Sequence, residues 1–335
     1  MEYSLISKYR AQLMGMAMIL IIIFHLSVKS IGFIDQMKNI CDFGVNLFFF
    51  LSGYSMYYAW LKNPNVSNFW KKRISRIFVT FLPIVIIWCL PQFLIGRISI
   101  WELIGKCSTV YFWYNGNLLY WFVSGLVVLY FVTPVWLKIF DRQPKIMVFA
   151  TVLIYVLLVY LARVTDLSHN KCFIDRALVY FMGLIIGRKA YNNCKVTKKE
   201  SVFIILFVLS GILVFAMSGY DFNNYDYKYI VELFFTVPVI LILVKMFDIT
   251  KGIYSFKILI FCGNITLECY LLHERILFVL GAITDKINIR LDPYLIVINI
   301  LAIIITIIVA KVYKLMIGHI YMNEAKSQLK KSFGL

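Results

Sequence analysis

Apolar stretches of about 20 residues follow one another along the whole chain, with short polar connectors between them. Such a stretch is long enough to cross the bilayer core as a helix, in which the backbone satisfies its own hydrogen bonds. The pattern predicts an all-α, polytopic integral membrane protein of about ten transmembrane helices, forming a single domain over residues 1–335. The expected spans are 12–31, 41–61, 75–95, 118–137, 146–162, 173–187, 201–219, 229–246, 259–282 and 294–313.

Composition and charge agree with this pattern and add an orientation. Hydrophobic residues make up 61% of the chain and charged residues 15%, whereas a soluble domain carries about 25% charged residues. The net charge of +17 does not indicate nucleic-acid binding, because the basic residues lie in the connectors. With the N-terminus inside, 23 Lys and Arg fall on the inner side and nine on the outer side, which predicts that both termini are cytoplasmic. By the same rule 62–74 and 188–200 face inward, and 219–228 and 283–293 face outward.

Ionisable residues inside the predicted spans mark the candidate chemistry, because such groups are costly in a bilayer and usually functional. The first span carries His25 and the ninth carries His273, at similar depths, so the two histidines can converge on one cavity. On a continuous ninth helix Glu268 and Arg275 share one face and His273 lies opposite, which predicts that this helix is buried on both faces. Glu268 lies deeper than Glu274 and is expected to matter more.

Two further patterns leave alternatives open. The basic run Lys71, Lys72, Arg73 and Arg76 at the inner end of the third span is either a topology anchor or an anion site for a phosphate-bearing substrate. The seven cysteines show no paired spacing of metal ligands, so no metal site and no permanently bound cofactor are predicted.

Five segments, in order along nearly the whole chain, resemble the acyltransferase-3 family of membrane proteins. They are the first helix from Leu13 to His25, the segment Gly44 to Tyr54 with Phe48-Phe49-Phe50-Leu51-Ser52-Gly53-Tyr54, the basic entry Phe69 to Ile77, Tyr120-Trp121-Phe122 with Pro134, and Gly263 to His273. The family usually has Arg or Lys eleven residues before the first-helix histidine. Here Met14 stands at that position, and Arg10, one turn earlier, is the nearest candidate.

The resemblance implies an O-acyltransferase of a bacterial plasma membrane that moves an acyl group, with acetyl the one expected, from a cytosolic acyl-CoA to a hydroxyl. The acceptor would be a cell-surface glycan or lipid-linked sugar, as in O-acetylation during polysaccharide biosynthesis, and membrane lipid would be the other partner. A transporter or flippase of a polysaccharide precursor is the rival interpretation of a charged helical bundle. The residues implied are His25, Glu268 and His273 for catalysis, Arg10, Arg73 and Arg76 for the donor, and Asn46, Ser52, Tyr120, Trp121 and Tyr270 for substrate contact.

A poor nucleophile such as a hydroxyl needs a general base, and histidine is the usual choice near neutral pH. His25 is therefore the expected base or the first acyl acceptor, and Glu268 the residue that orients or polarises a partner. On physics alone, packing explains Tyr120 and Trp121 better than substrate contact does.

Overall fold

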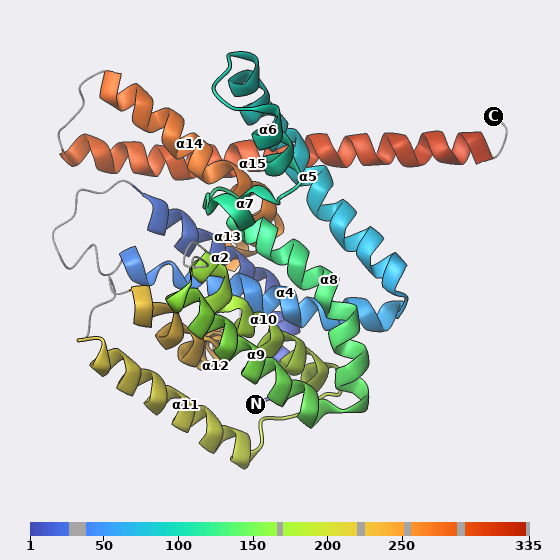
Figure 1. Cartoon of the computed structure of the whole chain (residues 1–335), viewed down its shortest axis with the longest axis vertical. Helices are drawn as coiled ribbons and strands as arrows, with labels where there is room; N and C mark the ends of the chain where they lie inside the picture. The colour runs from blue at the N-terminus through green and yellow to red at the C-terminus, as the bar shows by residue number, and fades with distance from the viewer. Residues whose placement is uncertain (27–37, 166–169, 220–224, 251–255, 287–291, 333–335) are drawn as a thin grey trace.

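The computed structural model describes residues 1–26, 38–165, 170–219, 225–250, 256–286 and 292–332. Within these ranges the regular elements are helices, and one isolated β-bridge joins Glu2 to Lys195 (Figure 1). The helices are α1 (Leu5–Lys8), α2 (Arg10–His25), α4 (Phe43–Lys62), α5 (Val66–Leu94), α6 (Ile100–Cys107), α7 (Tyr111–Asn115), α8 (Trp121–Arg142), α9 (Pro144–Val164), α10 (Lys171–Tyr191), α11 (Lys198–Met217), α12 (Tyr225–Ile249), α13 (Phe256–Asn264), α14 (Thr266–Lys286) and α15 (Asp292–Ser332).

Each predicted span coincides with one of these helices or with a helix pair, and the all-helical prediction is confirmed. Six described helices are long and apolar enough to cross a membrane, and the bent pair α13–α14 makes a seventh. The predicted count of ten therefore exceeds what length and composition support in the described residues. The additional predicted spans correspond to α2, which ends at His25, and to α4 and α10, which carry polar residues buried inside the bundle. The protein is a multi-pass, all-helical membrane protein.

Two close backbone contacts hold the centre of the bundle together. Gly53 of α4 and Gly183 of α10 face each other so closely that a Cβ on Gly53 would lie 2.0 Å from the Tyr180 carbonyl oxygen. Gly15 of α2 meets α13 in the same manner, since its Cβ would lie 1.9 Å from the Leu259 carbonyl oxygen. Small residues allow helices in a membrane to approach this closely.

The prediction of one straight ninth helix over 259–282 is wrong. α13 and α14 meet at an angle of 84°, with the break at Ile265. Gly263 lies against the backbone of Ala11, which fixes the end of α13 on α2, and the Lys314 ammonium donates to the Asn264 carbonyl at the break. Angular positions counted across the break therefore do not apply, although within α14 both Glu268 and His273 are buried as predicted.

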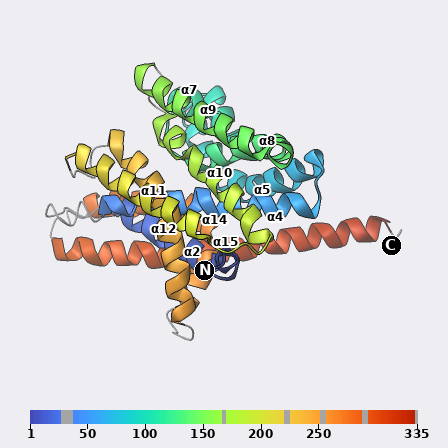
Figure 2. The same cartoon turned by 90° about the horizontal axis from the view of Figure 1, so that it is seen from below.

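The outer parts of the bundle are apolar helices whose side chains point away from the protein. α9 and α11 expose large side chains such as Phe149, Leu153, Phe203 and Leu213, as expected for surfaces in contact with lipid. In both views α15 runs along the bundle and its C-terminal part projects beyond it (Figures 1 and 2). The connector between the third and fourth predicted spans forms the short helices α6 and α7.

Contacts between distant connectors bear on the predicted sidedness. The backbone of residues 1–3 pairs with residues 194–196, through Tyr3 N–H to the Cys194 carbonyl and Val196 N–H to the Met1 carbonyl. The N-terminus and the connector 188–200 therefore lie on the same side, in agreement with the charge rule that predicts both to be inside. The segments predicted to face outward, 219–228 and 283–293, lie partly outside the described residues.

Candidate functional site

A cavity of about 520 Å³ opens at the end of the bundle where α2 begins. The starts of α2 and α5, the end of α4, the bend between α13 and α14, and α15 all contribute to its wall. Its charged side chains are Arg10, Arg73, Arg76 and Lys314, with Glu268 as the only carboxylate. The cavity is therefore strongly cationic, and guanidinium groups are well suited to bind phosphate. It brings together six predicted site residues, which are Arg10, Ser52, Arg73, Arg76, Glu268 and Tyr270.

Arg10 is the basic residue of α2 that lies nearest to Met14, the position at which a basic residue was expected. Both residues line the cavity, one turn apart on α2. The Arg10 Nε donates to the Ser55 hydroxyl of α4 at 2.7 Å, which directs the guanidinium into the cavity wall. Arg10 therefore places a guanidinium in this cavity from one turn before Met14.

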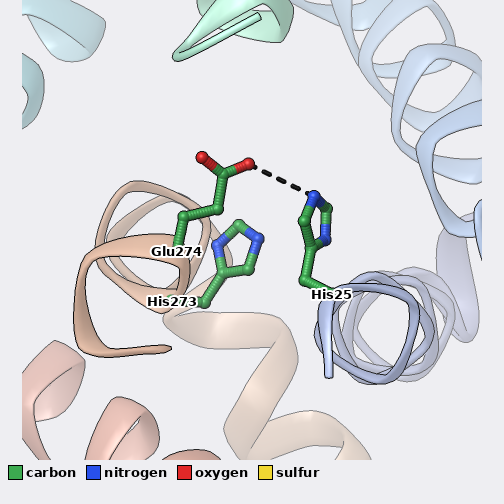
Figure 3. A group of neighbouring side chains, drawn as sticks. All are labelled: His25, His273 and Glu274. Atoms are coloured by element: carbon green, nitrogen blue, oxygen red, sulfur yellow. Dashed lines mark ion pairs between the residues drawn. The ribbon is translucent and has the colours of Figure 1, made fainter. Parts of the chain in front are cut away.

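The second polar group lies at the other end of α2 and consists of His25, His273 and Glu274 (Figure 3). The His25 Nε2 lies 3.2 Å from the Glu274 Oε1, and the two imidazole rings stand edge to face with centroids 4.8 Å apart. His273 is fully buried, whereas His25 and Glu274 are about one-third exposed. The predicted meeting of the two histidines is thus observed, and we call the three side chains the histidine centre.

Backbone carbonyls fix the tautomers in the histidine centre. The His25 Nδ1 lies 2.9 Å from the Ile21 carbonyl oxygen, and the His273 Nδ1 lies 2.7 Å from the Tyr270 carbonyl oxygen. A carbonyl only accepts hydrogen bonds, so each Nδ1 carries a proton and each neutral ring has its lone pair on Nε2. The His273 Nε2 is buried and has no hydrogen-bond partner among the described residues.

The histidine centre also has the donor atoms of a metal site. One atom from each of His25, His273 and Glu274 lies within 4.8 Å of the other two. The sequence predicted no metal site, because the search for ligands followed cysteine spacing and these three residues come from helices about 250 positions apart along the chain.

Sequence reasoning ranked Glu274 below Glu268, and the structure places Glu274 beside His25. Depth along a helix favoured Glu268, but Glu268 lines the cavity and Glu274 contacts His25. Its signal was its position directly after His273, which places the two side chains about 100° apart on α14. The contact between His25 and Glu274 makes Glu274 the carboxylate of the histidine centre.

A third polar group, the ion cluster, consists of Asp42, Arg176, Lys228 and Glu232. The Arg176 guanidinium donates to the Asp42 carboxylate and lies 3.7 Å from Glu232, while the Lys228 ammonium lies 3.1 Å from Asp42. All four side chains are buried. Asn46, a predicted substrate contact, donates to Glu232 at 3.2 Å and so belongs to this cluster rather than to the cavity.

The structure places the predicted substrate residues Tyr120 and Trp121 apart from both the cavity and the histidine centre. Tyr120 is buried in a left-handed conformation, φ +63°, with its ring against Phe81 and under the Arg275 guanidinium. Trp121 packs against Phe49 and lies below the Arg176 guanidinium of the ion cluster. A role for these two residues in substrate contact stays a prediction.

Comparison with known proteins gives one result. A family model described as an acyltransferase domain, that of the acyltransferase-3 family, matches residues 13–313, nearly the whole chain. No curated protein and no solved structure was found to match. The matched range contains the cavity, the histidine centre and the ion cluster, apart from the cavity residues Ser7, Arg10 and Lys314.

Proposed function

Because the chain belongs to the acyltransferase-3 family, we propose that it is a membrane O-acyltransferase that takes an acyl group, best an acetyl group, from a cytosolic acyl-CoA. The acceptor is a hydroxyl of a cell-surface glycan or lipid-linked sugar, and the protein works in a bacterial plasma membrane, in polysaccharide biosynthesis. We infer the reaction class from membership of the family and the choice of donor from the cationic cavity.

The cavity supports a donor that bears several phosphates. Three guanidinium groups and one ammonium, from Arg10, Arg73, Arg76 and Lys314, line it against a single carboxylate. Charge-assisted contacts to phosphate contribute on the order of 1.5–3 kcal/mol each, and guanidinium groups bind phosphate through two parallel hydrogen bonds. The cavity lies at the end that the charge rule places inside, where a soluble nucleotide thioester is available.

The cavity extends from its cationic mouth toward the histidine centre. Along α2, fifteen residues separate Arg10 from His25, which corresponds to about 22 Å. Tyr270 links the two sites, since its side chain lines the cavity, its ring lies 5.7 Å from the His273 ring, and its carbonyl accepts from His273. An extended donor with its phosphates at the arginines therefore directs its thioester toward the histidines.

The histidine centre is suited to activate the acceptor hydroxyl. Attack of the hydroxyl oxygen on the thioester carbonyl forms the ester C–O bond and breaks the C–S bond, and the hydroxyl proton ends on the departing thiol. The proton must pass through a group with a free lone pair, which the His273 Nε2 provides, and which the His25 Nε2 provides when it does not donate to Glu274. His25 is partly exposed and thus accessible to an acceptor from the outer side, and we assign it to this step together with His273.

The assignment is tested by mass spectrometry of surface polysaccharide and lipid-linked sugars from cells with and without the gene. Loss of an acyl mass from one component in the deletion strain, and its return with the intact gene, is the expected result. Purified protein in proteoliposomes, supplied with labelled acetyl-CoA and that component, should then transfer the label. A transporter or flippase would instead change the location of the component and yield no thioester-dependent product, which would overturn the proposal.

A further inference from the structure

We infer that His25, His273 and Glu274 bind one divalent transition-metal ion, with Zn²⁺ the best match to the donor set. Binding of the ion follows from the geometry of the three side chains alone. Its role in acyl transfer rests on the proposed function.

The first observation is the direction of the lone pairs. Each Nδ1–H donates to a backbone carbonyl, so both imidazoles turn an Nε2 lone pair away from their own helices. Figure 3 shows the His273 ring and the Glu274 carboxylate turned toward His25, from one helix toward the other. Histidines that bind metals almost always donate the other ring N–H to a carbonyl or carboxylate, which fixes the tautomer as observed here.

The second observation is a buried nitrogen that has no partner. The His273 Nε2 is buried with no hydrogen-bond partner among the described residues, and His273 stands in one group with His25 and Glu274. The adjacent Arg275 turns its guanidinium over Trp88, at 4.5 Å, and over Tyr120. A buried polar atom without a partner is costly in a protein interior, and a bound ion removes that cost.

The third observation is spacing. An ion with bonds of about 2.0–2.1 Å in tetrahedral geometry holds its ligand atoms about 3.3 Å apart. The His25 Nε2 and the Glu274 Oε1 are already 3.2 Å apart, and no separation among the three donors exceeds 4.8 Å. A small side-chain rotation therefore completes the set. The partial exposure of His25 and Glu274 leaves room for a fourth ligand on the open side.

Two histidines and one glutamate with an open fourth position form a donor set that binds catalytic Zn²⁺. Other divalent metals also bind such a set, but acyl transfer involves no redox step, which favours Zn²⁺. An acceptor hydroxyl bound as the fourth ligand would lose its proton more readily. That proton passes to the second oxygen of Glu274 and then to the departing thiolate, so His25 serves as a ligand and the bound alkoxide attacks the thioester.

The test begins with metal content. Full-length protein purified in detergent is stripped with a chelator, dialysed against Zn²⁺, and analysed by mass spectrometry for all transition metals. We expect one zinc ion per chain, and visible absorption bands after replacement with Co²⁺. His273→Gln and Glu274→Gln should each weaken binding by at least about tenfold, since loss even of an outer partner costs 10–100-fold.

Glu102→Gln is the matched control, because it removes a carboxylate of α6 that Lys106 already neutralises at 2.7 Å. The hydrogen bond from Lys106 holds the pKa of Glu102 below its ordinary value, so this residue is charged and separately satisfied. Binding by Glu102→Gln should equal that of the parent. Size-exclusion profiles show whether each variant is folded. The Co²⁺ spectrum of the parent tests metal binding even if a variant does not fold.

The inference is overturned if the parent protein binds no more Zn²⁺ or Co²⁺ than His273→Gln. The role of the ion in acyl transfer is overturned if transfer is unaffected in protein shown to be metal-free. In the second case the proposed function stands and His25 acts as the base directly. Stoichiometric zinc without any acyl transfer would instead support the inference and contradict the proposed function.

Discussion

The histidine centre and the ion cluster both place costly side chains inside the membrane, yet they differ in how their charges are satisfied. In the ion cluster two carboxylates face two cations, and all four side chains are buried. In the histidine centre one carboxylate contacts one imidazole, the other imidazole has an Nε2 without a partner among the described residues, and two of the three side chains are partly exposed. A self-neutralised buried group is complete without a ligand, whereas a group of acceptors that is open on one side needs a proton, a substrate or an ion. The ion cluster therefore fits a role in joining α4, α10 and α12, and the histidine centre fits chemistry.

The largest effect is expected at the histidine centre. His25→Gln should lower acyl transfer by about 10²–10⁴, because loss of a general base, and equally of a metal ligand, removes activation of the hydroxyl. Transfer by purified protein at matched amounts measures it. The variant should keep its size-exclusion profile and unfolding temperature, and activity within about threefold of the parent, far below the loss expected for a base, would remove His25 from the mechanism.

The ion cluster should respond in the opposite way. Asp42→Asn leaves Arg176 and Lys228 opposite a single carboxylate, and breaking a buried ion pair costs about 3–5 kcal/mol. We expect a clearly lower unfolding temperature or poor insertion. Asp141→Asn is the control, since it removes an exposed partner of Arg188 at 3.8 Å, for which about 0–1 kcal/mol is typical. If the Asp42→Asn protein is stable but inactive, the ion cluster has a functional role, and the proposed difference between it and the histidine centre is wrong.

Two carboxylates of α14 sharpen the comparison further. Glu274→Gln should reduce acyl transfer more than Glu268→Gln, because Glu274 contacts His25 and Glu268 contacts the cavity. We expect the Glu274 variant to lose turnover and the Glu268 variant to change mainly the apparent KM for the donor. Equal losses of turnover in both variants would contradict this order and restore the ranking by depth.

Within the basic run of residues 71–76, only the side chains that line the cavity should affect donor binding. Arg73→Ala or Arg76→Ala should raise the apparent KM for acetyl-CoA about tenfold or more, as expected for a lost charge-assisted contact to phosphate. Lys71→Ala and Lys72→Ala are matched controls, because these neighbours carry the same charge, are exposed and do not line the cavity. Similar donor KM in all four variants, with altered membrane orientation, would show that the run only anchors the protein.

The smallest effect is expected from cysteine labelling, which tests on which side of the membrane the cavity opens. In a variant with the six other native cysteines replaced, the exposed thiol of Cys194 should be protected from an impermeant reagent in intact cells and labelled after lysis. Adding Arg97→Cys in the connector after α5 should give a site that is labelled in intact cells. Labelling of Cys194 in intact cells would place the cavity outside and contradict a cytosolic donor.

The sequence predicted the parts of the site that depend on composition and depth. Apolar length predicted the helices. The positions of His25 and His273 in their predicted spans suggested that the two meet, and the structure places their rings 4.8 Å apart although the ninth span is broken at Ile265. The charge rule predicted one cationic end, where Arg10, Arg73 and Arg76 do line one cavity.

The other features of the fold and of the site depend on contacts between helices, which no local sequence pattern encodes. The break at Ile265 follows from the contact of Gly263 with Ala11, more than 250 residues earlier, and a helical wheel cannot register it. The pairing of Glu274 with His25 depends on that bend. The separation of Asn46 from the cavity follows from its hydrogen bond to Glu232 on a distant helix.

The break at Ile265 has a consequence for the exchange of backbone hydrogens with solvent. A continuous transmembrane helix surrounded by lipid protects its amides, but the first amides of any helix lack an acceptor within it. At the start of α14 these are the amides of Thr266, Leu267 and Glu268, and all three residues line the water-accessible cavity. Deuterium should therefore enter at the middle of this span before it enters either flank, and a donor bound in the cavity should slow that uptake, so one short peptide would report occupancy of the site.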